Sequence, residues 1–236
     1  MRVAVVIPAR NEAASLPRVL DAIPRHLVDE VVVIDNASTD GTAEAALSRG
    51  ATLLRESRRG YGSACLRGLD HLRASRPDVV VFLDADYSDH PEEMPLLLEP
   101  IERGQADLVI GSRVLGRRER GALLPQARVG NWVATRLMRA LYGGRYTDLG
   151  PFRAVRFEAL LCLRMADRDF GWTAEMQVKA LLAGLRVREV PVSYRRRLGR
   201  SKITGTVWGT ARAGAKILWT IGRNLRPGPA RPQRPF

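Results

Sequence analysis

Cysteine, histidine and aromatic residues are scarce in this chain, and each shortage excludes a class of protein. The 236 residues include only two cysteines, Cys65 and Cys162, far apart in segments with helical patterns. We expect a reduced thiol pair, because a disulfide-stapled fold needs more cysteines at closer spacing. The three histidines share no spacing typical of metal ligands. Aromatic residues make up 6% of the chain, which fits an ordinary α/β protein.

Long apolar runs are also missing. No stretch approaches the roughly 20 apolar residues that a membrane-spanning helix needs. The apolar run that begins at residue 3 is too short for the core of a signal peptide, and no small-residue cleavage site follows it. We therefore expect a first β-strand there. The expected location is the cytoplasm, and peripheral contact with the inner face of the membrane is an open alternative.

Acidic residues are rare in the second half of the chain. Residues 1–111 carry 12 Lys/Arg and 18 Asp/Glu, whereas residues 112–236 carry 26 and 7, which gives the whole chain a net charge of +13. Such asymmetry indicates a polyanionic partner for the second half: nucleic acid, an anionic membrane surface or a phosphorylated substrate. The alternative is a set of arginines on solvated faces.

Apolar segments alternate with helical patterns over the first half. Segments of strand character occupy 3–9, 30–38, 51–57, 78–86 and 106–113. Because these segments are almost wholly apolar and are separated by helix-length stretches, they predict a mostly parallel sheet covered by helices on both faces. The expected fold is a single α/β domain of Rossmann-like type.

The second half is less regular. Helical patterns occupy 126–144, 157–165 and 173–184, and residues 185–194 alternate as a strand does. Residues 203–224 predict an amphipathic helix that either lies on an anionic membrane or packs on the core. We expect one domain over 1–224, with a nucleotide-binding half (1–115) and an acceptor half (116–224). Residues 225–236 are basic and proline-rich and predict a disordered tail.

Two aspartates, Asp84 and Asp86, end the fourth apolar segment, where uncompensated charge is costly. Polar residues also end the first two segments, at 9–12 and 35–36. In open α/β sheets ligands bind outside the carboxyl ends of the strands, so these residues are expected to meet. Two carboxylates together need a cation and suit Mg²⁺ or Mn²⁺, with substrate phosphates completing the shell. The alternative is that either aspartate only caps the following helix.

The motifs VVIPARNEAASL, VVVIDNASTDGTAE, GYGSACLRGL and VVVFLDADYSDHPEE resemble, in order and spacing, the family 2 glycosyltransferases of the GT-A type. Within that family the chain is most similar to dolichyl- or polyprenyl-phosphate sugar transferases. The resemblance covers about the first 115 residues closely and TDLGPFRAVR, GWTAEMQVKALLAG and VPVSYRRRLGRSKI more loosely. It implies a GT-A fold and an enzyme that binds a nucleotide-diphosphate sugar through a divalent metal and transfers the sugar with inversion.

The resemblance also implies roles for individual residues. The nucleotide-sugar site would comprise Pro8, Ala9, Arg10, Glu12, Asp35, Gly60, Gly62, Asp84, Ala85 and Arg113. Asp84 and Asp86 would bind the metal, with Asp86 the more direct ligand. Ser88, where relatives often have Gln, is the third metal-binding candidate. The two glycines would let the backbone approach the nucleotide.

The acceptor half must bind the group that receives the sugar. A hydroxyl acceptor requires a general base, for which Asp148 and Glu175 are the catalytic candidates. A phosphate acceptor is already an anion and needs cations instead; Arg128, Arg200, Ser201 and Lys202 resemble the phosphate-binding set of the family. We expect a lipid phosphate, namely polyprenyl phosphate, as the acceptor, with a small hydroxylated molecule as the alternative.

Other classes of protein share parts of this pattern. A phosphatase of the haloacid dehalogenase type also ends a strand in D-x-D, but on its first strand. A sugar nucleotidyltransferase would carry a glycine-rich N-terminal loop. A basic nucleic-acid-binding protein would show interleaved aromatic and basic residues, so we expect no nucleic-acid partner. A catalytically idle relative would not need the intact Asp84–Asp86 pair.

Overall fold

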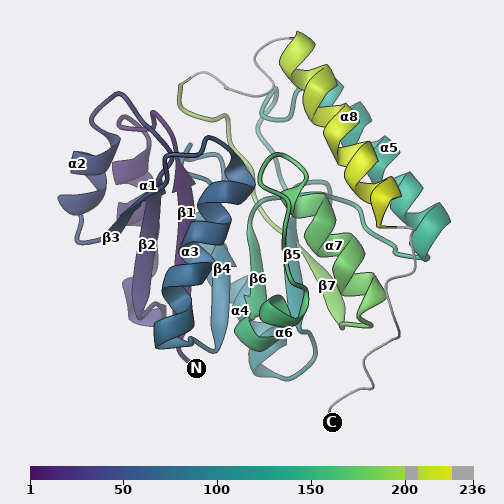
Figure 1. Cartoon of the computed structure of the whole chain (residues 1–236), viewed down its shortest axis with the longest axis horizontal. Coiled ribbons are helices and arrows are strands. Elements are labelled where there is room, and N and C mark those ends of the chain that lie inside the picture. The colour runs from purple at the N-terminus through teal and green to yellow at the C-terminus, as the bar shows by residue number, and fades with distance from the viewer. Residues whose placement is uncertain (200–206, 225–236) are drawn as a thin grey trace.

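The computed structural model describes residues 1–199 and 207–224 (Figure 1). The predicted tail 225–236 and three acceptor-site candidates, Arg200, Ser201 and Lys202, lie outside the described residues. Cys65 and Cys162 are both free thiols, as expected.

The first half folds as alternating strands and helices. Its strands are β1 (Val3–Ala9), β2 (Glu30–Asp35), β3 (Thr52–Arg55), β4 (Val79–Phe82) and β5 (Leu108–Ser112). Its helices are α1 (Leu16–Ala22), α2 (Thr42–Leu47), α3 (Tyr61–Ser75) and α4 (Met94–Glu102), with short 3₁₀ turns at Arg25–Leu27 and Pro91–Glu93. The strand β4 stops at Phe82, so the D-x-D residues follow the strand instead of ending it.

The second half adds four helices and two strands to the described structure. They are α5 (Pro125–Tyr142), β6 (Arg153–Arg156), α6 (Phe157–Cys162), α7 (Trp172–Leu182), β7 (Val187–Pro191) and α8 (Val207–Arg223). Four residues of the segment between α5 and α6 form the strand β6 in the central sheet.

The two halves share one sheet. Its seven strands lie in the order β3-β2-β1-β4-β6-β5-β7. All neighbouring pairs are parallel except those of β6, which is antiparallel to both β4 and β5. The expected mostly parallel GT-A-type sheet is confirmed. Because β6 separates β4 from β5, the second half of the chain completes the sheet of the first.

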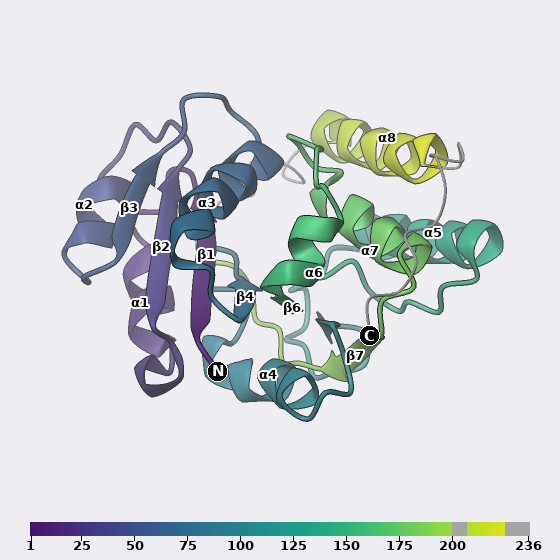
Figure 2. The same cartoon turned by 60° about the horizontal axis from the view of Figure 1, so that its bottom comes forward.

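Helices cover both faces of the sheet, as Figure 2 shows. One apolar core lies beneath α3, α6 and α7 and includes Phe82 and Trp172, whose rings meet edge to face at 5.9 Å. The other core lies beneath α1, α2 and α4. The buried strands are apolar on both faces, which is the pattern of a sheet with two covered faces.

The C-terminal helix α8 is present as expected and packs beside α5 on the outside of the molecule (Figures 1 and 2). Tyr142 of α5 donates its hydroxyl hydrogen bond to the carbonyl of Ile221 in α8 at 2.5 Å. Among residues 1–199 and 207–224, no helix is both long enough and apolar enough to cross a membrane.

The position of β6 predicts that the first half cannot fold alone. A fragment of residues 1–115 would leave β5 without either of its strand partners, β6 and β7. We expect the fragment to lack a cooperative thermal transition in circular dichroism. A chain of residues 1–224, which keeps every strand, is the control and should melt like the full chain. A sharp transition in the 1–115 fragment would contradict this account.

Candidate active site

A cavity of about 340 Å³ opens at the carboxyl ends of β1, β2 and β4. Its wall combines the ends of these strands with residues from the second half of the chain. The lining residues are Pro8, Ala9, Arg10, Glu12, Asn36, Arg59, Gly60, Tyr61, Ala64, Asp84, Ala85, Asp86, Asp169, Phe170, Arg197 and Arg212. The edge at which parallel strands end is where ligands of α/β sheets bind.

The end of β2 presents a different residue to the cavity than expected. Asp35 does not line it; the Asp35 carboxylate accepts a hydrogen bond from the Ser38 amide at 3.0 Å. The next residue, Asn36, lines the cavity and accepts the Gly60 amide at 2.8 Å, while its side-chain amide donates to the carbonyl of Arg58 at 2.7 Å. Asn36 therefore fixes the loop before α3. A polar residue directly after a buried strand was the signal that pointed to it.

Asp84, Ala85 and Asp86 line the cavity as predicted. The Asp86 Oδ1 atom accepts hydrogen bonds from the Ser88 amide at 2.9 Å and from the Ser88 hydroxyl at 2.5 Å. Ser88 is fully buried and is absent from the cavity lining. The contacts of Ser88 thus orient the Asp86 carboxylate, which is a positioning role beside the metal-ligand role that the sequence predicted.

The carboxylates fit a site for a divalent cation. The Asp84 Oδ1 atom is buried and has no hydrogen-bond partner in the described part of the chain. Burial, followed by the neighbouring Asp86 carboxylate, raises the pKa of Asp84 to about 7. No group of three or more His, Cys, Asp or Glu side chains in residues 1–199 and 207–224 forms a complete metal cage. A two-carboxylate site that leaves positions for substrate phosphates is the arrangement that Mg²⁺ favours.

Asp89 is a third buried carboxylate that the sequence analysis missed. Its side chain has no hydrogen-bond partner in the described part of the chain. Burial first, and then the charges of Asp84 and Asp86, raise the pKa of Asp89 well above its usual value. The signal was a third acid within six residues of the D-x-D motif. Its carboxyl group therefore favours the neutral form beside the two predicted ligands.

Gly60 and Gly62 allow a close approach, but to the protein backbone. A Cβ atom on Gly60 would overlap the carbonyl oxygen of Arg168, and one on Gly62 would overlap the carbonyl oxygen of Asp167. The Gly62 amide donates to the Asp169 carbonyl at 3.2 Å, so the start of α3 is paired with this segment. Gly60 also lines the cavity. The glycines therefore join the two halves of the chain at the cavity wall.

Replacing Gly62 by alanine tests this contact. Gly62→Ala should lower the free energy of unfolding by about 1–3 kcal/mol, because overpacking forces a backbone shift. The matched control is Gly130→Ala, also within a helix, where a Cβ would meet nothing within 4 Å and alanine should stabilise by up to about 1 kcal/mol. Urea denaturation measures both. Equal stability of the two variants would show that the close approach is absent.

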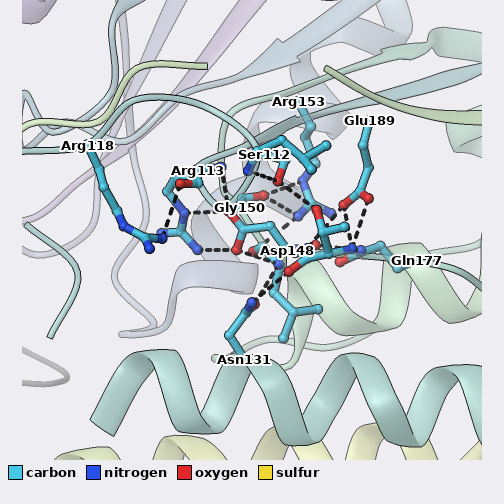
Figure 3. Close-up of polar contacts among 12 residues, drawn as sticks. Ser112, Arg113, Arg118, Asn131, Asp148, Gly150, Arg153, Gln177 and Glu189 are labelled. Carbon is cyan, nitrogen blue, oxygen red and sulfur yellow. Dashed lines mark hydrogen bonds and ion pairs between the residues drawn. The ribbon is translucent and has the colours of Figure 1, made fainter. Parts of the chain in front are cut away.

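Arg113 and Asp148 form a buried ion pair (Figure 3). The Arg113 guanidinium donates twice to the Asp148 carboxylate, from Nε at 2.8 Å and from Nη2 at 2.7 Å, and the Arg113 amide adds a third bond at 2.8 Å. The Leu149 amide donates a fourth at 2.8 Å. Although burial works to raise it, the charge and hydrogen bonds of Arg113 hold the pKa of Asp148 below its usual value. Neither residue lines the cavity.

Glu175 is also committed to structural contacts. Its carboxylate is buried and accepts the amides of Ala166 at 3.0 Å and Asp167 at 2.7 Å. Lys179 and Arg223 lie 2.9 Å and 3.5 Å from its second oxygen. Glu175 does not line the cavity. These contacts favour structural roles for both predicted general bases, Asp148 and Glu175.

The variant Asp148→Asn distinguishes a structural role of Asp148 in the ion pair with Arg113 from a catalytic role as general base. If the ion pair is structural, the variant should lose about 3–5 kcal/mol of unfolding free energy near pH 7, because Arg113 is left buried without a counter-ion. A carboxylate with a lowered pKa stabilises above its unfolded pKa and loses that contribution in acid, so the difference should narrow below about pH 4. The control is Asp70→Asn in an exposed pair with Arg73. Unchanged stability with abolished transfer would instead support a general base.

A second cavity, of about 770 Å³, lies along α5 and contains the predicted Arg128. We call it the arginine groove. Its lining holds five arginines and no acidic residue among those described: Arg118, Arg128, Arg136, Arg139 and Arg145, with Val114, Leu123, Pro125, Val129, Asn131, Trp132, Thr135, Tyr146 and Thr147. Arg118 also donates to the Arg113 carbonyl at 3.4 Å. The groove is thus in contact with the residue that anchors Asp148.

The sheet order, with a cavity that carries Asp84 and Asp86 at the carboxyl ends of its strands, is that of a GT-A-type fold. Residues 4–164 match the family model described as "Glycosyl transferase family 2". The chain belongs to glycosyltransferase family 2 and is a glycosyltransferase. This assignment replaces the phosphatase interpretation that the D-x-D motif left open.

Similar proteins extend over nearly the whole chain. An uncharacterized glycosyltransferase of Mycobacterium tuberculosis is 42% identical over 88% of this chain and 92% of its own. The undecaprenyl-phosphate mannosyltransferase of Micrococcus luteus is 34% identical over 89% of this chain and 91% of its own. The polyprenol monophosphomannose synthase of Mycolicibacterium smegmatis is 33% identical over 87% of this chain and 82% of its own.

Solved structures support the same fold. The glucosyl-3-phosphoglycerate synthase of Mycobacterium tuberculosis in complex with Mn²⁺, UDP and glucosyl-3-phosphoglycerate matches with a TM-score of 0.69 and 27% identity. The match covers 94% of this chain and 80% of that one. The same enzyme in complex with phosphoglyceric acid matches with a TM-score of 0.72 and 26% identity, over 95% of this chain and 80% of that one.

Proposed function

We propose that this glycosyltransferase moves a sugar from a nucleotide-diphosphate sugar to the phosphate of a polyprenyl phosphate, with inversion at the anomeric carbon. The donor half of the proposal rests on the cavity that carries the buried, unpartnered carboxylate oxygen of Asp84 beside Asp86. The structural neighbour crystallised with Mn²⁺ and UDP supports a donor held through a divalent ion. Either Mg²⁺ or Mn²⁺ suits two carboxylates and a diphosphate.

One observation carries the choice of acceptor: the arginine groove has five arginines and no acidic residue in its described lining. Arginine is the side chain best matched to phosphate, because its planar fork donates two parallel hydrogen bonds. The apolar residues Val129 and Trp132 in the same lining suit a lipid chain next to a phosphate. The names of the Micrococcus and Mycolicibacterium relatives support a polyprenyl phosphate over other phosphates.

The hydrogen bonds and ion pairs of the two predicted general bases also support a phosphate acceptor. A phosphate oxygen is already anionic, so its attack requires no proton removal, whereas a hydroxyl acceptor requires a base. Asp148 is held by four donors and Glu175 by two amides and two cations. An enzyme for a phosphate acceptor can use both carboxylates structurally without losing a catalytic group.

The reaction exchanges one carbon–oxygen bond for another. An acceptor phosphate oxygen bonds to the anomeric carbon from the side opposite the leaving group, and the bond from that carbon to the diphosphate breaks. When bound, the divalent ion supplies positive charge to the departing nucleoside diphosphate. Asp84 and Asp86 would hold that ion, Ser88 orients Asp86, and Pro8, Ala9 and Asn36 form the wall against which the nucleoside would lie.

Exposed tryptophans on α5 and α8 support contact with a membrane that contains the lipid acceptor. The side chains of Trp132 and Trp219 are 59% and 55% exposed, far more than buried anchors would be. Arg136 lies over the ring of Trp132 at 5.4 Å, and Lys216 and Arg223 lie over that of Trp219 at 4.8 Å each. Tryptophan beside basic residues on a helix suits the headgroup layer of an anionic bilayer. We propose peripheral contact at the inner face of the membrane.

A small phosphorylated acceptor with a hydroxyl group is the second candidate. The cavity lining includes Asp169, a carboxylate from the second half that the sequence analysis did not select. Asp169 would be the candidate base for such an acceptor. The structural neighbour in complex with phosphoglyceric acid gives this candidate a precedent within the fold.

A panel assay decides between the acceptors. The full chain, Mn²⁺ and labelled UDP- and GDP-sugars are incubated either with undecaprenyl phosphate in anionic vesicles or with 3-phosphoglycerate, and products are identified by mass spectrometry. We expect label in the lipid phosphate and co-sedimentation of the chain with the vesicles. Asp86→Asn should lower the rate by about 100-fold, because a metal ligand is weakened.

Three results would contradict the proposal. Transfer to 3-phosphoglycerate alone would establish the second candidate. Full transfer by Asp86→Asn with Mn²⁺ present would remove the metal-site assignment. Release of inorganic phosphate from phosphomonoesters without any nucleoside diphosphate would exclude glycosyl transfer by this site.

A further inference from the structure

Arg197 bridges two carboxylates of the cavity lining, those of Asp86 and Glu12. Its Nη1 atom lies 3.3 Å from Asp86 Oδ2, and its Nη2 atom lies 3.1 Å from Glu12 Oε1. Both carboxylates are only 11% exposed, and Arg197 itself lines the cavity. One guanidinium therefore links the loop after β1 to the D-x-D motif after β4.

The backbone that carries Arg197 is fastened to the D-x-D segment. The Leu198 amide donates to the Asp86 carbonyl at 2.9 Å, and the Arg195 amide donates to the Ser88 carbonyl at 2.9 Å. The Arg195 guanidinium stacks on the ring of Tyr87, 3.6 Å from its centroid. Because the main chain is held on both sides of Arg197, its charge stays within reach of the cavity even when the side chain rotates.

The two oxygens of Asp86 have different partners. Ser88 occupies Oδ1 with two hydrogen bonds, and Arg197 is the cationic partner of Oδ2. A divalent ion that binds Asp86 through Oδ2 would meet the positive charge of the guanidinium at close range. Like charges a few ångströms apart repel strongly in a partly buried site. The guanidinium and the metal ion must therefore compete for this oxygen.

We infer that Arg197 is the resident cation of the unloaded site and exchanges Asp86 for the donor diphosphate when a metal ion binds. Before the metal ion binds, the guanidinium pairs with Asp86 and Glu12 and bridges them. With a metal ion on Asp86, the guanidinium is released and its planar fork is free to pair with phosphate oxygens. The inference deepens the donor half of the proposed function and does not depend on the acceptor.

This exchange makes metal and nucleotide binding cooperative. Metal alone must break the Arg197 contacts without compensation, whereas metal together with a diphosphate gives the released guanidinium a new partner. By linkage, the nucleotide must strengthen metal binding by the same factor by which the metal strengthens nucleotide binding. Arg197→Met, which keeps a similar side-chain length without the charge, removes the competing cation and the phosphate partner together.

The test measures Mn²⁺ and nucleotide binding on the intact chain, without any transfer reaction. Mn²⁺ alone is titrated by electron paramagnetic resonance, and UDP and GDP are titrated by calorimetry at saturating Mn²⁺. For Arg197→Met we expect about tenfold tighter binding of Mn²⁺ alone and about tenfold weaker binding of the preferred nucleotide. The control is Arg196→Met, an exposed neighbour whose side chain bonds the Arg120 carbonyl away from the cavity; both affinities should match those of the wild type.

The two affinities of Arg197→Met are expected to change in opposite directions, with tighter binding of Mn²⁺ and weaker binding of the nucleotide. A misfolded site would instead bind both ligands more weakly. Unchanged or weaker binding of Mn²⁺ alone by Arg197→Met would overturn the inference, and so would unchanged nucleotide binding. The proposed function fails separately: if the wild type binds Mn²⁺ and nucleotide cooperatively but transfers no sugar to undecaprenyl phosphate, only the acceptor assignment is lost.

Discussion

The burial of three neighbouring aspartates is the constraint on which the rest of the site depends. Asp84, Asp86 and Asp89 lie within six residues, and each is close to the charge of another. Like charges in a partly dry environment cannot all remain ionised without compensation. Arg197 compensates the charge of Asp86, and the charge of Arg113 acts on both Asp84 and Asp89. A site with a raised carboxylate pKa and an unpartnered oxygen is prepared for a further cation.

The compensating arginines have to be held in place, and this requirement explains much of the second half. Arg113 is fixed by the carboxylate of Asp148. The backbone amide of Asp148 in turn donates a hydrogen bond to the Glu189 carboxylate at 3.0 Å. Glu175 fixes the turn at Ala166 and Asp167, and that turn packs its backbone against Gly60 and Gly62. Carboxylates that resemble catalytic bases in the sequence are therefore parts of the frame around the cavity.

The helix α8 is connected to the same frame. Lys216 lies 3.1 Å from Asp167 in the turn that supports the cavity wall, and Arg223 lies 3.5 Å from Glu175, the carboxylate in α7 that holds this turn. Arg212 of the same helix lines the cavity itself. Trp219, on the outside of α8, is flanked by Lys216 and Arg223. In the helix proposed to contact the membrane, Lys216 and Arg223 therefore contact both the exposed Trp219 and the carboxylates near the cavity wall.

The sequence was sufficient for features that depend on local pattern. The apolar strands and the polar residues after them predicted the parallel sheet and placed Ala9, Asn36, Asp84 and Asp86 at one edge. Strand β6 was harder, because four residues with arginine at both ends give little periodicity and its partners are distant in sequence. Distance in the sequence also hid two ion pairs, that of Asp148 with Arg113, 35 residues away, and that of Glu175 with Arg223.

The charge asymmetry of the chain matches the different side chains that its two halves contribute to the two cavities. The acidic half supplies the carboxylates at the strand ends, where a cation and a diphosphate would bind. The basic half supplies Arg197 and Arg212 to that cavity and five arginines to the groove along α5. Since a nucleoside diphosphate and a phosphate acceptor are both anions, they repel each other on approach unless cations surround them. A chain whose second half carries 26 Lys/Arg against 7 Asp/Glu would provide those cations, while the carboxylates proposed to bind the metal ion lie in the half proposed to hold the donor.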